Sequence, residues 1–360
     1  MATISLCMIV KNEENVLSRC LESIKNAVDE IIIADTGSTD RTKEIAEKYT
    51  DKVFDFKWVD DFSKARNFSF SKATKDYIMW LDADDVVSEK NLEKLIELKN
   101  KIQDTDVIMM KYITAFDENG EAAFSYYRER LIRRASIPIW KGRVHEAIEP
   151  KGSIIYSDIE IEHHSIKTEY SRRNLNIYEK QIMDGEPMQP RDKFYYGREL
   201  YYHNQYSRAI KVLSDFTESK DGWFENKIEA CRILSHCYRT AGKIDDALRA
   251  LFSSFSYDVP RAEICCESGN LFMIKEQYPQ AIYWFRLALE LPKEEKNGSF
   301  NNISAQGYLP CIQLCVCYDR LGNHTEAEKY NTMAGKYRPC SAAYLQNVEY
   351  FNTLHQRDIF

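Results

Sequence analysis

The stretch Leu81-Asp82-Ala83-Asp84-Asp85 is the most informative part of this sequence. The hydrophobic run at residues 77–81 predicts a strand that leads directly into two acids with the spacing Asp-x-Asp. Alternate acids at a strand end place hard oxygen ligands side by side with little freedom of the backbone. This geometry suits a divalent cation that also contacts a diphosphate. Because Asp-x-Asp is common by chance, its interpretation depends on the rest of the chain.

Two other predicted strands end in clusters of the same kind. Residues 4–10 lead into Lys11-Asn12-Glu13-Glu14, and residues 30–34 lead into Asp35-Thr36-Gly37-Ser38-Thr39-Asp40. Short β-branched runs alternate with amphipathic helices in this half of the chain, which predicts a largely parallel, three-layer α/β sheet. Ligands bind at the carboxyl ends of the strands in such sheets. We therefore expect the three clusters to converge on one site.

The expected elements of this half end near residue 165. The strands are expected at residues 4–10, 30–34, 52–56, 77–81, 106–114 and 154–162, and the helices at residues 16–26, 41–49, 63–73 and 89–101.

From about residue 192 the strand pattern gives way to pairs of helices. Each pair has a short break and then an alanine in its second helix: Ala209, Ala247, Ala281 and Ala327. A recurrence near 34 residues is typical of tetratricopeptide repeats, although a generic helical bundle is the alternative. We therefore expect a catalytic domain with a connecting helix at residues 1–185 and a repeat domain at residues 186–360.

Composition excludes some classes of protein. The length of 360 residues suggests about two domains, and the net charge of -7 argues against a broad nucleic-acid-binding surface. No apolar run is long enough to cross a bilayer, and residue 4 already begins a strand-like run without a basic leader. The ten cysteines form no Cys-x-x-Cys pair and are expected to be reduced thiols. These features predict a cytoplasmic protein.

Residues 1–90 resemble the family 2 glycosyltransferases, which have the GT-A fold. The resemblance is carried by Met8-Ile9-Val10-Lys11-Asn12-Glu13-Glu14, Ile31-Ile32-Ile33-Ala34-Asp35-Thr36-Gly37-Ser38-Thr39-Asp40-Arg41-Thr42, Phe62-Ser63-Lys64-Ala65-Arg66-Asn67 and Leu81-Asp82-Ala83-Asp84-Asp85. The segment Trp140-Lys141-Gly142-Arg143-Val144-His145-Glu146, with His164, is similar to a subgroup that carries helical repeats. That subgroup includes enzymes that glycosylate peptides on cysteine, as in glycosylated bacteriocins. The resemblance implies a Rossmann-like GT-A domain followed by an all-α, tetratricopeptide-like domain.

The resemblance also implies a UDP-sugar as donor substrate. Asp35 could accept a hydrogen bond from the uracil imide, and Asn12 and Glu13 could bind the base or the ribose hydroxyls. The alternative role for Asp35 is to cap the helix that begins near Arg41, although Asp40 is better placed for that. Arg66 suits a diphosphate or a base carbonyl, or is otherwise a surface arginine paired with an acid. The implied donor-binding residues are Val10, Asn12, Glu13, Asp35, Arg66, Asp82 and Ala83.

A Mn²⁺ or Mg²⁺ ion is the implied cofactor. By the resemblance, Asp84 binds the ion directly, and Asp82 reaches the ribose, or the metal through water. His164, which follows the strand expected at residues 154–162, matches the histidine that often completes the metal shell, and an imidazole suits Mn²⁺ better than Mg²⁺. Otherwise His164 is simply exposed to solvent.

Inversion at the anomeric carbon requires a general base near the acceptor. The resemblance makes Glu146 the first candidate, with His145 orienting it or acting instead, and Asp85 is the alternative base. Glu146 could otherwise be an exposed loop acid. Trp140 could pack against the sugar or belong to the core.

These features predict an inverting, metal-dependent transferase that moves a hexose or N-acetylhexosamine to a Ser, Thr or Cys side chain of a peptide or protein. Helical repeats often bind extended peptides on a concave surface, which favours a polypeptide acceptor. The second hypothesis is transfer to a polysaccharide or lipid-linked glycan, with the repeats forming a homodimer. The third is a repeat scaffold with a vestigial nucleotide-binding domain, and the complete set Asp35, Arg66, Asp82 and Asp84 argues against it. No Gly-x-Gly-x-x-Gly follows the first strand, which excludes a Rossmann dehydrogenase.

Overall fold

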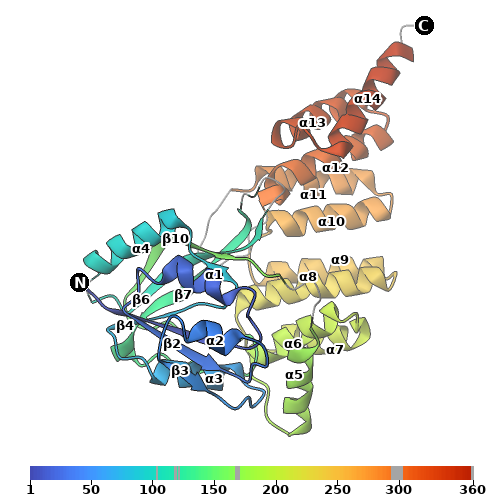
Figure 1. The fold of residues 1–360 in the computed structure, drawn as a ribbon. Coiled ribbons are helices and arrows are strands. Elements are labelled where there is room, and N and C mark those ends of the chain that lie inside the picture. The colour runs from blue at the N-terminus through green and yellow to red at the C-terminus, as the bar shows by residue number, and fades with distance from the viewer. Residues whose placement is uncertain (103, 117–119, 121, 167–170, 293–302, 358–360) are drawn as a thin grey trace. The chain divides into compact units, whose positions relative to one another are not determined.

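The chain forms two compact units that divide between Pro187 and Met188 (Figure 1). This computed structural model describes residues 1–102, 104–116, 120, 122–166, 171–292 and 303–357. The first unit contains the β-sheet, and the second is helical. The assignment of residues 1–185 to catalysis and of residues 186–360 to repeats stays a prediction.

An eight-stranded sheet in the order β3-β2-β1-β4-β7-β6-β10-β5 forms the centre of the first unit. Its strands are β1 (Ile4–Val10), β2 (Glu30–Asp35), β3 (Val53–Asp55), β4 (Tyr77–Trp80), β5 (Asp85–Val86), β6 (Val107–Phe116), β7 (Ala122–Arg133) and β10 (Ile154–His163). Strands β1 to β4 are parallel, as expected, and their register places Val10 opposite Asp35. The carboxyl ends of β1 and β2 therefore meet at one edge.

Strand β7 was not predicted from the sequence. It lies antiparallel to both β4 and β6, so the sheet is mixed rather than largely parallel on this side. The strand carries Arg128, Glu129 and Arg130 in succession, and charged residues in a row argue against a buried strand. Arg130 is nevertheless fully buried, because it forms an ion pair with the buried Asp85. Asp85 lies far from Arg130 in the sequence, so the local pattern does not reveal this partner.

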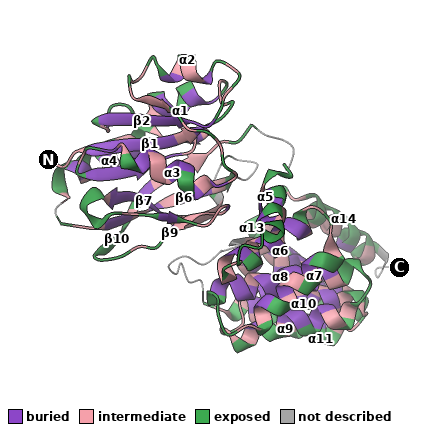
Figure 2. Cartoon of the chain, turned by 90° about the horizontal axis from the view of Figure 1, so that it is seen from below, coloured by how far each residue is buried: buried purple, intermediate pink, exposed green. Residues whose placement is uncertain are grey.

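Helices cover both faces of the sheet, which confirms the three-layer prediction. Alternate residues of β1, such as Leu6 and Met8, face α1 (Leu17–Ile24), while α2 (Thr42–Ala46) and α4 (Glu89–Lys101) pack in the same layer. The opposite face packs on the helix α3 (Phe62–Ser71) and on the small ladder of β8 (Trp140–Lys141) and β9 (Ala147–Ile148). Figure 2 shows buried strands between these layers.

Helix α3 is fixed at its start by an N-cap. The carboxylate of Asp61 accepts hydrogen bonds from the Lys64 backbone N–H at 3.0 Å and from the Ser63 hydroxyl at 2.7 Å. Such a cap contributes about 1 kcal/mol and satisfies an otherwise unpaired backbone donor. It also sets the rotation of the helix that carries Arg66.

The second unit consists of paired helices, as predicted. They are α6 (Pro190–Tyr202) with α7 (Tyr206–Glu218), α8 (Phe224–Thr240) with α9 (Ile244–Ser253), α10 (Ala262–Ile274) with α11 (Tyr278–Glu290), and α12 (Tyr308–Arg320) with α13 (His324–Tyr337), followed by α14 (Ala342–Arg357). Helix α5 (Arg173–Met183) precedes them in the first unit.

The alanines predicted in the second helices mark close helix contacts. Ala209, Ala247, Ala281 and Ala327 are each fully buried. A residue with positive φ ends each first helix, which turns the chain back on itself: Asn204, Gly242, Glu276 and Gly322. A Cβ on Gly269 would lie 2.6 Å from the Phe285 ring, so α10 and α11 approach too closely there for any larger residue.

A buried carboxylate at the start of β2 leads to a stability prediction. The side chain of Glu30 accepts hydrogen bonds from Ser5, Lys52 and Thr74. Burial alone would raise its pKa, but these donors outweigh that effect and lower the pKa from 4.5 to about 2. Because the folded pKa is the lower one, this stabilisation is present above pH 4.5 and is lost as the pH falls toward 2.

Glu30→Gln is therefore expected to lower the free energy of unfolding at pH 7 by roughly 3 kcal/mol, with a smaller difference as the pH falls below about 4.5. Denaturant unfolding of both proteins between pH 7 and pH 3.5 measures this. Glu93→Gln, at an exposed position on α4, is the control. A constant difference at all pH values would show that the charge of Glu30 is not the cause.

Candidate active site

A cavity of about 310 Å³ lies at the carboxyl ends of β1, β2 and β4. The predicted site residues that line it are Val10, Glu13, Arg66, Asp82, Ala83, Asp84, His145 and Glu146. The structure therefore brings most of the predicted residues into one space, although they come from two strand ends, one helix and a later loop. Asn12, Asp35 and His164 are not part of this lining.

Arg66 lies at the centre of this group. Its Nη2 donates to Oδ1 of Asp82 at 2.8 Å, and its Nε donates to Oε1 of Glu146 at 2.6 Å. Its guanidinium lies 4.9 Å from the ring centre of Trp80 and 4.8 Å from that of Trp140. The Arg66 side chain is only 10% exposed, so this cation joins the Asp-x-Asp acid to the candidate base inside a nearly closed environment.

The charges of this group are strongly coupled. Burial alone would raise the pKa of Asp82, but the guanidinium groups of Arg66 and Arg130 outweigh it and hold the pKa well below its usual range. Burial alone would lower the pKa of Arg66, whereas Asp82 and Glu146 hold it above its usual range. Both groups are therefore ionised at any physiological pH.

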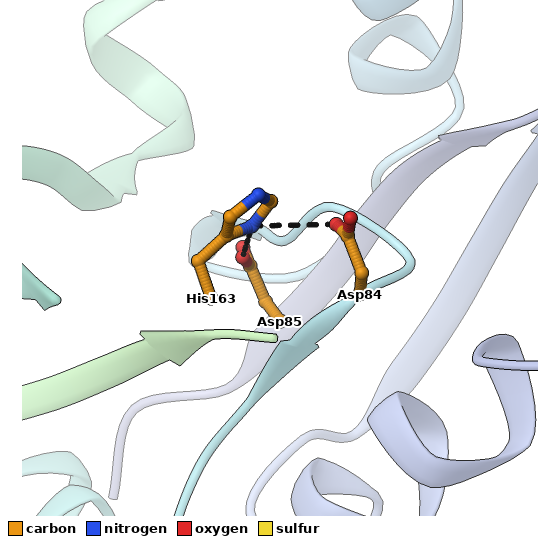
Figure 3. A group of neighbouring side chains, drawn as sticks. All are labelled: Asp84, Asp85 and His163. Carbon is orange, nitrogen blue, oxygen red and sulfur yellow. Dashed lines mark hydrogen bonds and ion pairs between the residues drawn. The ribbon is translucent and has the colours of Figure 1, made fainter. Parts of the chain in front are cut away.

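Asp84, Asp85 and His163 form a group that could hold a metal ion (Figure 3). Nδ1 of His163 lies 3.4 Å from Oδ1 of Asp84 and 3.1 Å from Oδ1 of Asp85. Burial raises the pKa of Asp84, as do the neighbouring Asp82 and Asp85, while His163 opposes the shift. An acid held in such surroundings is stabilised by an added cation, and carboxylate and imidazole ligands fit Mn²⁺.

Asp85 has a different position from the other acids. It is fully buried, and its Oδ2 forms a 3.0 Å ion pair with the equally buried Arg130. Its carboxylate also accepts hydrogen bonds from the Tyr112 hydroxyl at 2.9 Å and from the Asp82 backbone N–H at 2.9 Å. This closed environment argues against Asp85 as the alternative base, because a base must reach the acceptor. Oδ1 of Asp85 also lies 3.1 Å from Nδ1 of His163, so Asp85 orients that imidazole ring.

His163, rather than the predicted His164, has its imidazole beside Asp84 and Asp85. Nε2 of His164 contacts Oε2 of Glu162 at 2.9 Å, and the His164 ring stacks on Phe116. Neighbouring residues at a strand end point in opposite directions, so only one of the two histidines can face Asp84. The structure places His163 there, and His164 as a metal ligand is not supported by this geometry.

The residues predicted for the nucleoside lie around the loop after β2. Oδ1 of Asp35 accepts from the backbone N–H groups of Gly37 and Ser38, while its Oδ2 is buried with no hydrogen-bond partner among the described residues. Asp35 does not cap the next helix: Oδ1 of Asp40 accepts from the Thr42 backbone N–H at 3.0 Å, and the N-cap position of α2 belongs to Arg41. An unpaired buried carboxylate oxygen fits a ligand N–H such as the uracil imide.

Asn12 is tied into the same loop. Its side-chain oxygen accepts from the Thr39 backbone N–H at 2.8 Å, and the backbone N–H of Asn12 donates to the Ser38 hydroxyl at 3.0 Å. Asn12 adopts a positive φ of 54°, which asparagine tolerates better than most residues. These contacts show a role in shaping the loop, and a direct contact with the donor stays a prediction.

Trp140, whose role the sequence left open, belongs to the core. It is 2% exposed and packs edge-on against Trp80 and Phe70, so it is a core residue rather than a lid. Asn67 accepts from the Trp140 backbone N–H at 2.8 Å and donates to its carbonyl at 3.0 Å. Asn67 therefore has a structural role in holding the Trp140 segment.

Sequence reasoning missed several residues of the cavity. Trp58 and Phe62 line it as a pair with ring centres 4.8 Å apart, and Arg173 of α5 lies 4.7 Å above the Phe62 ring. Trp58 and Phe62 could have been found as aromatic residues at or just before the start of a predicted helix. No sequence signal pointed to Arg173 and Asn174, because only folding brings α5 to the strand ends.

Within the described part of the chain, helices lack the combination of length and hydropathy that a membrane span requires.

Parts of this chain are similar in sequence to known proteins. Residues 5–151 match the family model described as Glycosyl transferase family 2. A TPR repeat-containing protein of Synechococcus elongatus is 38% identical over 149 residues, covering 41% of this chain and 36% of that protein. The SPbeta prophage-derived glycosyltransferase SunS of Bacillus subtilis is 30% identical over 228 residues, covering 59% of this chain and 52% of that protein.

A third relative is covered almost completely. The lipopolysaccharide core biosynthesis glycosyltransferase LpsC of Rhizobium meliloti is 26% identical over 275 residues, covering 68% of this chain and 97% of that protein. The chain spans only about a third to a half of the other two relatives. Residues 5–151 of this chain form a family 2 glycosyltransferase domain, and a region of paired helices follows it.

Proposed function

We propose that this glycosyltransferase transfers a hexose or N-acetylhexosamine from a UDP-sugar with inversion and with the help of Mn²⁺ or Mg²⁺. The observation that carries the proposal is the cavity in which the Asp-x-Asp acids and Glu146 meet around Arg66. Carboxylates outnumber the cationic side chains in this group, which favours an added divalent cation.

In this proposal the nucleoside lies at the ends of β1 and β2. Oδ2 of Asp35, which has no partner among the described residues, would accept a hydrogen bond from the uracil imide, and Glu13, which lines the cavity, would bind the ribose, with Asn12 as a further candidate contact. Asp84, with His163 in place of His164, holds the metal, and Asp82 contacts the ribose or the metal through water. When bound, the ion stabilises the negative charge of the departing UDP.

Glu146 is the proposed general base. The acceptor O–H or S–H loses its proton to Glu146 while its oxygen or sulfur forms a bond to the anomeric carbon. The bond from that carbon to the UDP oxygen breaks in the same step, and UDP leaves with the electron pair. One in-line displacement of this kind inverts the anomeric centre. His145, which also lines the cavity, is the alternative base.

The proposed acceptor is a Ser, Thr or Cys side chain of a peptide or protein. Similarity to the glycosyltransferase SunS covers 228 residues and so extends beyond the stretch 5–151 of the family model. The helical unit also has a polar groove of about 220 Å³ between α6, α8 and α10, lined by Tyr201, Arg232, His236, Arg239, Glu267 and Asn270 among others. A groove with both charges and amide groups suits an extended peptide.

The second candidate acceptor is a polysaccharide or lipid-linked glycan, with the repeats forming a homodimer. Similarity to LpsC over nearly its whole length favours this alternative. A scaffold without activity is disfavoured, because the Asp-x-Asp acids line the cavity and Arg66 pairs with both Asp82 and Glu146 there.

A donor screen followed by acceptor mass analysis tests the proposal. Calorimetry with Mn²⁺ is expected to show tighter binding of one UDP-sugar than of free sugar or of ADP-sugars. Intact-mass analysis of peptides co-expressed with the chain is expected to show the addition of one hexose or N-acetylhexosamine. Modification of a glycan but no peptide would favour the second acceptor, and no UDP-sugar binding at all would overturn the proposal.

A further inference from the structure

We propose that Arg66 is a positioning residue that holds the base Glu146 at a set distance from the donor acid Asp82. The inference rests on the proposed function, since it assumes the roles of both carboxylates. It differs from the sequence prediction, in which Arg66 itself binds the diphosphate or the base carbonyl. The argument depends on the contacts that already occupy this guanidinium.

The Arg66 guanidinium is committed to two protein carboxylates. Its Nε donates to Oε1 of Glu146 and its Nη2 donates to Oδ1 of Asp82, at 2.6 and 2.8 Å. A rigid, planar guanidinium fixes the separation of the groups bound to two of its nitrogens, which a lysine ammonium does not do. Each carboxylate contributes one oxygen to Arg66, and the second oxygen of each remains for other partners.

Two indole rings hold this guanidinium in place. It lies 4.9 Å from the Trp80 ring centre and 4.8 Å from that of Trp140. The Trp80 and Trp140 rings are themselves packed edge to face, with centres 5.0 Å apart. An arginine held on two aromatic rings does not swing freely toward an incoming phosphate.

The segment that carries Glu146 is fastened to the same helix as Arg66. Asn67 pairs with both backbone groups of Trp140, and the backbone N–H of Phe62 donates to the Arg143 carbonyl at 2.8 Å. The Tyr178 hydroxyl donates to the Val144 carbonyl at 3.1 Å. Backbone anchors thus place residues 140–144, and Arg66 places the carboxylate two residues later.

This arrangement joins the donor side of the cavity to the acceptor side through one side chain. A displacement of about 1 Å in a catalytic group can reduce turnover by about 100-fold. Arg66 therefore contributes to turnover through Glu146, and its contribution should disappear when Glu146 cannot act as a base.

Arg66→Lys, alone and combined with Glu146→Gln, tests this inference. Turnover is followed as hydrolysis of UDP-glucose, UDP-galactose and their N-acetyl forms with Mn²⁺, and UDP binding is followed by calorimetry. Arg66→Lys is expected to lower kcat by about 10- to 100-fold and to change UDP affinity by less than about threefold. In the Glu146→Gln background, the same change is expected to lower kcat by less than about threefold.

The control is Phe70→Leu. Phe70 packs edge to face on Trp140 with ring centres 5.8 Å apart, and it carries no charge. Its replacement disturbs the same aromatic cluster and is expected to affect kcat equally in both backgrounds. Unfolding of the metal-free single and double variants gives a second readout, in which Arg66→Lys and Glu146→Gln should be non-additive.

An equal loss of kcat in both backgrounds, or a loss of UDP affinity as large as the loss of kcat, would overturn the positioning role. The second result would restore Arg66 as a donor-binding residue. If Glu146→Gln alone is fully active, or if none of the four donors is hydrolysed, the proposed function has failed instead.

Discussion

Asp84→Asn is expected to reduce Mn²⁺-dependent turnover of a UDP-sugar by about 1,000-fold or more. The substitution keeps the size of the side chain and removes the charge that would hold the ion. Loss of the ion removes the stabilisation of the departing diphosphate, which is worth several kcal/mol. Steady-state hydrolysis and transfer, measured over a range of Mn²⁺ concentrations, give the size of the effect.

The same substitution is expected to increase the stability of the metal-free protein. The folded protein raises the pKa of Asp84, so its ionised form opposes folding at neutral pH. Asp84→Asn is therefore expected to raise the Tm of the metal-free protein and to abolish the rise in Tm that Mn²⁺ causes. Asp51→Asn, at an exposed position outside the cavity, is the control. Unchanged turnover together with an unchanged response to Mn²⁺ would remove Asp84 from the metal site.

Glu146→Gln is expected to slow transfer by about 100- to 10,000-fold and to leave UDP binding intact. The glutamine can still accept a hydrogen bond from Arg66, but it cannot take a proton from the acceptor. Transfer is measured as kcat, and UDP binding by calorimetry with Mn²⁺. An effect on kcat alone separates a role in proton transfer from a role in donor binding.

Glu149→Gln provides a matched control three residues further along. The Glu149 side chain is 65% exposed and pairs with Lys141 at 3.5 Å, so its replacement is expected to leave turnover unchanged. Wild-type activity of Glu146→Gln would move the base elsewhere. His145, which lines the same cavity at a backbone φ of 51°, would then be tested first.

Most of the first unit could be predicted from local patterns. The strand at residues 4–10 and the helix at residues 89–101 agree with β1 and α4 at both ends. Hydrophobic runs and amphipathic periods are local properties, so they are visible in the chain itself. Strand β7 was missed because its charged residues can be buried only when they are paired. Arg130 pairs with the distant Asp85, and Arg128 pairs with Glu129.

Some site residues were likewise visible in local patterns, whereas others depended on contacts between distant segments. The acids Asp35, Asp82 and Asp84 were recognised because each directly follows or nearly follows a hydrophobic strand. The choice between His163 and His164 depended on which side of β10 faces the acids, and a single residue of register reverses that direction. Arg173 was not recognised because α5 contributes to the cavity only in the folded chain.

The sequence by itself determined the α/β class, the helical pairs, the family resemblance and the acidic residues at the strand ends. Those properties depend on residue type and spacing, which are encoded locally. Only the tertiary structure decided that Arg66 is held between Asp82 and Glu146, that Asp85 is closed off by Arg130, and that His163 faces Asp84. Burial, charge pairing and side-chain direction arise from contacts between distant segments, and spacing along the chain does not contain them.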